Sequence, residues 1–209
     1  MAGKITALKI QNRNKERVNV FLDDEYAFAV TVTVALTLKK GQYLTDNEIE
    51  QLKGQDEKDK AYSHALRYLG FRARSRQEVE QYLVKKGYTP PVVAATIQRL
   101  LDQEYLDDEV FARWWLENRQ QFRPRSQRAL RYELRQKGIA NEIIETLFTN
   151  LDEEELAWAA VSPKLAQWQN FDQEKLKQKV LGFLSRRGFN YEIAHRIFDR
   201  AWTDLSSTK

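Results

Sequence analysis

Two short basic segments have the residue types of a phosphate-binding site. Residues 72–75 and 123–126 both read Arg-x-Arg-Ser, and serine is a preferred N-cap residue of helices. Guanidinium groups beside the exposed backbone N–H groups of a helix N-terminus would bind phosphate oxygens. Ordinary solvated loop residues would give the same pattern, and the sequence leaves both interpretations open. The arginines concerned are Arg72, Arg74, Arg123 and Arg125.

Further basic residues surround the second segment. Arginines in the helix expected at 126–137 recur at spacings of three and four, which places them on one face. Glu133 is the only acidic residue between Arg119 and Gly138. This face is either simply solvated or binds acidic protein groups or DNA phosphates in a salt-sensitive way. The candidate binding residues here are Arg119, Arg128, Arg131, Arg135 and Lys137, and the set is completed by Arg76, Lys85, Lys86, Arg186 and Arg187.

One acidic run, Asp107-Asp108-Glu109, is the only candidate for metal-dependent chemistry. Adjacent carboxylates in one helical turn diverge, and neither histidine of the chain is nearby in sequence. Helix capping by Asp107 and complementation of the helix dipole by the next two carboxylates explain the run better than a nuclease site. Since cysteines and a Gly-x-x-x-x-Gly-Lys-Ser/Thr loop are also missing, we predict no catalytic residue, no metal and no cofactor.

Composition indicates a globular protein with a highly charged surface. Of the 209 residues, 42% are hydrophobic and 31% are charged, and the net charge is +4. This mildly basic balance permits a polyanionic partner without requiring one. The sequence contains no apolar run long enough to span a bilayer and no signal peptide at its start. We therefore expect no membrane association.

The helices that must position these side chains repeat along the chain. Gly87, Gly138 and Gly188 are separated by 51 and 50 positions, and a leucine stands four residues before each. Such self-similarity is typical of a repeat array. Three helices are expected in each repeat: 57–70, 75–86 and 90–103, then 107–121, 126–137 and 141–150. In the third repeat, Ser162-Pro163 interrupts the first helix, and the second begins at Asp172 and is a turn longer.

The front of the chain is different, because apolar and polar residues alternate between residues 4 and 30. We predict two or three antiparallel strands, covered by short helices near 32–38 and 45–52, with a boundary in the charged stretch 54–60. Trp114 and Trp115 could stack on bases, although helical spacing favours one in the core and one at a repeat junction. The predicted fold is mainly α: tandem three-helix, helix-turn-helix-like repeats at 56–106, 107–152 and 153–209, after a small α+β extension at 1–55 that carries a β-hairpin or three-stranded sheet.

The order and spacing of several motifs together resemble the bacterial RecX family of regulatory proteins. The similarity is almost continuous from Lys60 to Ile144, and Arg187-Gly188-Phe189 matches the end of the family's third repeat. No single motif is specific alone. Those that carry the resemblance are Ala65-Leu66-Arg67-Tyr68-Leu69, Arg74-Ser75-x-x-Glu78-Val79, Leu83-x-x-Lys86-Gly87, Tyr105-Leu106-Asp107-Asp108-x-x-Phe111-Ala112-x-x-Trp115 and Leu134-x-x-Lys137-Gly138-Ile139.

This resemblance implies a function that composition and spacing do not. Members of the family bind the RecA recombinase filament and modulate it, mainly by inhibition, which lowers ATP hydrolysis and strand exchange and so affects recombination and DNA repair. They are cytoplasmic and carry out no chemistry themselves. Some also bind DNA, so single- or double-stranded DNA is a second candidate partner. We expect the protein to act as a monomer. A DNA-binding module that works without RecA is the competing hypothesis.

Overall fold

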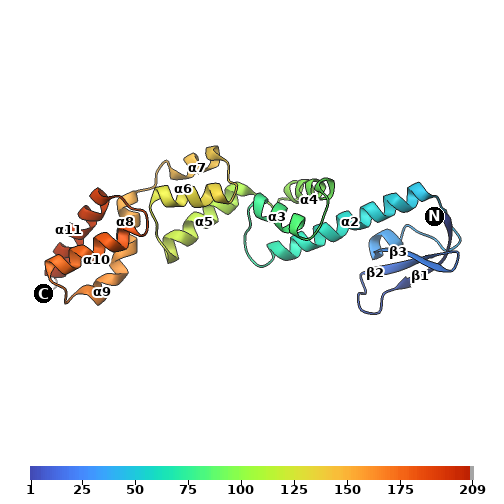
Figure 1. Cartoon of the computed structure of the whole chain (residues 1–209), viewed down its shortest axis with the longest axis horizontal. Coiled ribbons are helices and arrows are strands. Elements are labelled where there is room, and N and C mark those ends of the chain that lie inside the picture. Colours follow the sequence, from blue (N-terminus) through green and yellow to red (C-terminus); the bar gives the residue numbers. More distant parts are fainter. Residues whose placement is uncertain (208–209) are drawn as a thin grey trace. The chain divides into compact units, whose positions relative to one another are not determined.

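The chain folds into two compact units in the computed structural model, which describes residues 1–207 (Figure 1). The first unit contains residues 1–72 and 79–106, and the second contains residues 73–78 and everything from Asp107 onward. Eleven α-helices, four strands and one 3₁₀ turn follow each other along the described chain, and two of the helices, α1 and α9, have only four residues each. The predicted class, mainly helical with a small sheet in front, is confirmed.

A four-stranded antiparallel sheet with the strand order β3-β2-β1-β4 begins the first unit. Alternation places Val18, Val20 and Leu22 in its buried face. Asp23 and Asp24 adopt positive φ values of 46° and 70°, as a tight hairpin turn requires. The fourth strand was not predicted, because two residues are too few to show alternation. The strands are β1 (Gly3–Ile10), β2 (Arg17–Leu22), β3 (Glu25–Thr31) and β4 (Tyr43–Leu44).

The helix α2 (Asp46–Leu69) contradicts the predicted break between residues 54 and 60. It has 24 residues, and Figure 1 shows it as one uninterrupted helix. Thr45 and Glu48 form the predicted capping box at its start. Gly54 costs only about 1 kcal/mol within a helix and is tolerated. The other helices of this unit are α1 (Val32–Ala35), α3 (Arg76–Lys85), whose first residues belong to the second unit, and α4 (Pro90–Asp102).

A buried ion pair explains why the charged stretch is helical. Asp56, whose side chain is only 6% exposed, accepts two hydrogen bonds from Arg17 at 2.7 and 3.0 Å. Lys60 contacts the same carboxylate at 2.8 Å, and Arg17 also donates to the Ala29 carbonyl at 2.9 Å. Residues that resemble a polar linker in the sequence therefore fasten α2 to the sheet.

The second unit follows the predicted repeat pattern closely. The helix α10 has 13 residues where α3 and α6 have 10, so the extra turn predicted for the third repeat is confirmed. The first helix of the third repeat is interrupted at Ser162-Pro163, as predicted. The elements are α5 (Asp108–Phe122), α6 (Gln127–Gln136), α7 (Asn141–Phe148), α8 (Glu153–Val161), the 3₁₀ turn η1 (Ser162–Lys164), α9 (Leu165–Trp168), α10 (Gln173–Ser185) and α11 (Tyr191–Ser207).

The second and third repeats share one hydrophobic core. A single cluster of buried side chains extends from Phe111 in α5 to Ala201 in α11. Trp114 and Trp115 are both partly buried against this cluster. The first repeat has a separate cluster, from Ala61 to Leu106, and the sheet has its own. Repeats two and three are therefore joined by side-chain packing and form one body.

Left-handed glycines end the second helix of every repeat. Gly87, Gly138 and Gly188 have φ values of 89°, 78° and 87°, in the region that side chains with a Cβ avoid. A Cβ on Gly138 would lie 2.7 Å from the Cβ of Gln77, and one on Gly188 would lie 2.7 Å from the Ser126 hydroxyl. The turns at Gly138 and Gly188 thus sit against the start of the second helix of the preceding repeat. A Cβ built on Gly87, in the first repeat, would meet no such neighbour within 4 Å among the described residues.

Carboxylates complete the same junctions. Asp108, the first residue of α5, accepts the N–H of Arg76 at 2.8 Å. Glu153, the first residue of α8, accepts the N–H of Gln127 at 3.3 Å. In both cases the first helix of one repeat caps the second helix of the repeat before it. The junction is therefore built twice from equivalent positions.

The core of the second repeat yields a stability prediction. Leu134 is fully buried, so Leu134→Ala should lower the free energy of unfolding by about 2–5 kcal/mol through lost transfer energy and a cavity. Val110→Ala is the control, because Val110 is 58% exposed and its loss should change stability by less than about 0.5 kcal/mol. Urea unfolding followed by circular dichroism measures both. Equal losses would contradict the assigned core.

The glycine turns yield a second prediction. Gly87→Ala should cost only the strain of a left-handed alanine, about 1–2 kcal/mol. Gly188→Ala adds a collision with Ser126 and Ala129, worth about 1–3 kcal/mol more. Urea unfolding of the two variants compares these losses directly. If Gly188→Ala cost no more than Gly87→Ala, the close contact at the junction would be wrong.

Candidate functional site

The arginine face of α6 is partly neutralised by the next helix. Arg131 and Arg135 both approach Glu145 in α7, at 3.3 and 3.8 Å. Arg131 also lies over the ring of Phe148 at 4.4 Å. Arg128 is exposed and forms no ion pair within residues 1–207. Glu145 was not predicted as a counter-charge, because it stands ten positions beyond Arg135 and lies outside α6.

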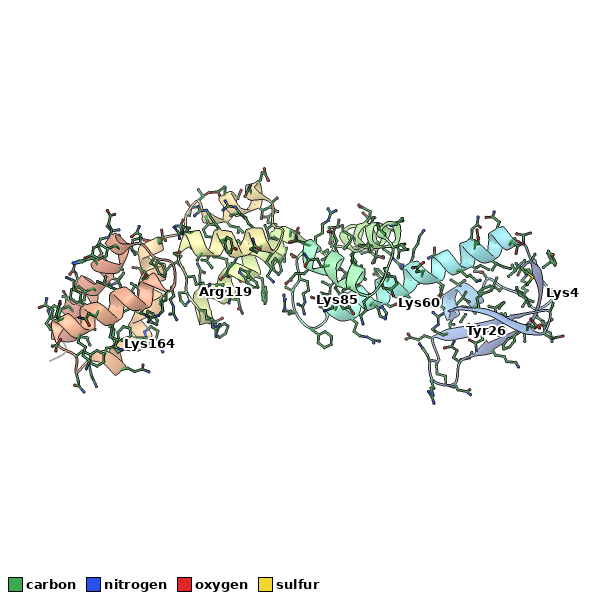
Figure 2. The ribbon with its side chains drawn as sticks, in the orientation of Figure 1. Lys4, Tyr26, Lys60, Lys85, Arg119 and Lys164 are labelled. Atoms are coloured by element: carbon green, nitrogen blue, oxygen red, sulfur yellow. The ribbon has the colours of Figure 1, made fainter. Side chains whose placement is uncertain are left out.

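Glu133 organises a second group of predicted residues. Its carboxylate accepts hydrogen bonds from Arg119 at 2.7 Å and from the indole N–H of Trp115 at 2.9 Å, and it pairs with Arg125 at 2.9 Å. Arg119, labelled in Figure 2, also lies 4.5 Å from the Trp115 ring. Arg119 and Arg125 are thus both held by Glu133 of the same repeat, which is a structural role.

Lys137 serves the junction between the first and second repeats. Its ammonium group lies 2.5 Å from the carboxylate of Glu78 and 5.1 Å from the ring of Trp115. The Glu78 side chain is largely buried, so this pair is better shielded from solvent than an ordinary surface pair. Trp115 therefore lies beside a repeat junction, as one of the two tryptophans was predicted to do.

The remaining predicted residues of the first repeat lie near the two ends of α3. Arg72 and Arg74 are half-buried in the loop before it, and Arg76 is its first residue. Lys85 ends the helix and Lys86 follows; both are exposed, and Lys85 is labelled in Figure 2. Lys86 lies 5.6 Å from the Tyr82 ring. Cations at this end also complement the helix dipole.

The protein's own groups occupy part of the predicted phosphate seat. The arginines do precede serine N-caps, and Ser126 accepts the N–H of Ala129 at 3.1 Å. However, the N–H of Ser126 donates to the Arg187 carbonyl at 3.1 Å, and that of Gln127 donates to Glu153. Two first-turn amides of α6, those of Gln127 and Ala129, thus donate to groups within the protein and are not available to an anion.

The acidic run is structural, as favoured above. Asp107 caps α5 by accepting the N–H groups of Glu109 and Val110 at 2.7 and 3.0 Å. Asp108 caps α3, and Glu109 pairs with Arg113 at 2.8 Å. The three carboxylates therefore serve different partners. Within residues 1–207 no group of three histidine or acidic residues is arranged to hold a metal ion.

A concentration of positive charge lies where the second and third repeats meet. Arg186 and Arg187 directly follow α10, and Arg123 and Arg125 stand in the loop before α6. Burial lowers the pKa of the Arg187 guanidinium, and the nearby charges of Arg125, Arg186 and Arg123 lower it further. Arg123, Arg186 and Arg187 form no ion pair within the described chain. The structure thus brings together predicted residues that lie about sixty positions apart.

A groove of about 500 Å³ adjoins this cluster. It lies between α6 and the turn that joins α10 to α11, and its lining includes both Arg128 and the acidic Glu153, together with Gly188. Phe122, beside Arg123, is 68% exposed, and its equivalent in the first repeat, Phe71, is 79% exposed. The sequence analysis overlooked these aromatic residues, although the repeated pattern Phe-Arg-x-Arg-Ser is visible in the sequence.

The chain matches family models over nearly its whole length. Residues 3–45 match the regulatory protein RecX N-terminal domain. Residues 61–100, 107–147 and 152–198 match the first, second and third RecX three-helix domains. The predicted order of one small domain and three helical repeats is the order of these matches. No helix among residues 1–207 has the length and apolar character needed to cross a membrane.

Full-length relatives and solved structures agree with these matches. The chain is 36% identical to the regulatory protein RecX of Bacillus subtilis (strain 168), over 94% of this chain and 76% of that protein. It is 34% identical to that of Lactobacillus johnsonii, over 98% and 76%. A crystal structure of regulatory protein RecX superposes with a TM-score of 0.71 and 27% identity, covering 95% of this chain and 100% of that one. The chain therefore belongs to the RecX family of regulatory proteins.

Proposed function

We propose that this protein binds the RecA filament on DNA and lowers its ATP hydrolysis and strand exchange. Membership of a family of regulatory proteins, with all four family domains present in order, carries the proposal. The chain has no nucleotide-binding loop of the Gly-x-x-x-x-Gly-Lys-Ser/Thr type, so ATP turnover is assigned to RecA. A cytoplasmic location follows from this partner.

Charge distribution supports binding through side chains near the junction of repeats two and three. Arg123, Arg128 and Arg186 are exposed and lack ion pairs within residues 1–207. By contrast Arg131, Arg135 and Arg119 are used inside the repeats. Exposed cations accelerate association with an acidic surface and make binding sensitive to salt. We therefore assign the contact with the filament to the unpaired group.

Inhibition requires no chemistry from this protein. A ligand shifts a conformational equilibrium only by the difference in its affinity for the two states. A regulator that binds a less active form of the filament, or its growing end, would lower turnover in that way. Blocking of the growing end has a distinct signature, because a few bound molecules then prevent many RecA subunits from joining.

The ATPase of RecA on single-stranded DNA tests this proposal. Turnover should fall when this protein is added well below the RecA concentration. The variant Arg123→Glu with Arg128→Glu should inhibit at least about tenfold less tightly, since both charges are reversed without breaking an ion pair. Lys164→Glu with Lys179→Glu is the control, because it changes the net charge equally, at η1 and α10, and should leave inhibition unchanged.

Two outcomes would contradict the proposal. Unchanged turnover with a folded protein and RecA from the same organism would remove the regulatory function. Equal losses in the two double variants would mean that net charge, and not this group of arginines, determines binding.

Direct DNA binding without RecA is the second candidate function, favoured by the same unpaired arginines. For this function the logarithm of the binding constant should fall steeply with the logarithm of salt concentration, with a slope of about −0.7 to −0.9 per phosphate contact. Fluorescence anisotropy of labelled single-stranded and duplex DNA measures the slope without RecA. A slope near zero would exclude phosphate contacts as the source of any affinity observed.

A further inference from the structure

The two repeat junctions differ in one charge. At the first junction, Lys137 stands immediately before the left-handed Gly138 and pairs with Glu78 at 2.5 Å. Glu78 is the third residue after the N-cap serine, Ser75. The cation that ends one repeat is thus neutralised by a carboxylate from the repeat before it.

The second junction repeats this geometry without the carboxylate. Arg187 stands immediately before Gly188 and is the equivalent of Lys137. Its carbonyl accepts the N–H of Ser126 at 3.1 Å, so the turn is fixed against the start of α6. The third residue after Ser126, in the place of Glu78, is Ala129. A Cβ on Gly188 would lie 3.2 Å from the Ala129 side chain, which confirms that this position faces the turn.

Arg187 therefore has no counter-ion at this junction among the described residues, and the charges near it are those of Arg125, Arg186 and Arg123. Its guanidinium lies 3.8 Å from the Phe183 ring, which holds it in place. The carboxylate of Glu133, which pairs with Arg125, also holds Arg119 and is committed within the second repeat. Complementation of the α10 dipole accounts for a cation at the end of that helix, but not for Arg123 in the facing loop.

We propose that this junction is a binding site for a phosphate group, which supplies the negative charge that Glu78 supplies at the first junction. Arg187, Arg186 and Arg123 would bind the phosphate oxygens, and the nearby charge of Arg125 would add to the electrostatic attraction. Bound there, the anion would also screen the repulsion between the repeats and so fasten the third repeat to the second. The site and this consequence do not depend on RecA.

The chemistry of the cluster fits phosphate better than a single carboxylate. Three arginines without ion pairs carry more than enough charge to neutralise the nearly −2 of a phosphate group, and the planar guanidinium binds its oxygens in pairs. The nearby groove of about 500 Å³, lined by Arg128 and Glu153 and by none of these three arginines, leaves room for the rest of a phosphorylated molecule. Phe122, 68% exposed beside Arg123, offers a surface on which a base could stack. Nucleic-acid backbone and free phosphate compounds share this chemistry.

The decisive variant restores the missing carboxylate. Ala129→Glu places at the second junction the residue that the first junction has, so Arg187 gains an internal partner. The matched control is Ala129→Gln, which has nearly the same shape without the charge. Calorimetric titration with pyrophosphate, and anisotropy with a labelled single-stranded oligonucleotide, would be measured on the full-length protein in the absence of RecA.

We expect Ala129→Glu to weaken pyrophosphate binding at least about tenfold and Ala129→Gln to change it by less than about twofold. Pyrophosphate should raise the unfolding temperature of the wild type and of Ala129→Gln, but not of Ala129→Glu. Arg187→Gln should reproduce the loss, which keeps the test valid if Ala129→Glu fails to fold. If the oligonucleotide also binds, and its binding is lost in the same variants, the natural phosphate belongs to nucleic acid. If only pyrophosphate binding is lost, the natural ligand is a free phosphate compound.

Three results would overturn the proposal. The first is the same pyrophosphate affinity in Ala129→Glu and Ala129→Gln, and the second is no binding of either probe to the wild type. The third is binding of poly-glutamate as tight as that of pyrophosphate, which would assign the site to an acidic protein. Because RecA is absent from these measurements, the ATPase test remains a separate measurement, and either proposal can fail while the other stands.

Discussion

The contact between a left-handed glycine turn and the start of the preceding repeat's second helix is the constraint on which the second unit depends. A turn with φ near +80° lets Gly138 and Gly188 approach Gln77 and Ser126 without a Cβ in the way. At the same junction the N–H of Ser126 donates to the Arg187 carbonyl, and the N–H of Gln127 donates to Glu153. One geometric requirement thus fixes where each repeat begins and which cations lie side by side.

Local signals were sufficient for most of the fold. Capping residues such as Thr45, Asp107 and Ser126, and the glycines that follow the second helices, are read from short stretches of sequence, and the structure has them in those roles. The errors arose where a distant partner decides the outcome. The stretch 54–60 looks like a linker unless Arg17, about forty positions earlier, is known to reach Asp56. The two-residue strand β4 likewise exists only through its pairing with β1.

The same limitation applies to the site. Spacing in one helix places Arg128, Arg131 and Arg135 on one face, but it cannot show that Glu145 of the next helix pairs with the latter two. Nor can it show that Arg187 lies beside the loop of Arg123 and Arg125, since that contact joins different repeats. Sequence therefore shows where the charged residues are, while tertiary pairing determines which of them have charge left to offer a partner.

A repeat protein contains its own comparison, and this makes the unpaired arginines informative. Equivalent positions share a backbone geometry, so a difference in side chains between two junctions is not a difference in fold. Lys137 and Arg187 occupy one position, and only the first has a carboxylate opposite it. Repulsion among Arg123, Arg186 and Arg187 opposes the packing of repeat three on repeat two, yet the shared core holds them together. A carboxylate opposite Arg187, like the one opposite Lys137, would remove that repulsion, and the proposed anion supplies this charge from outside the chain.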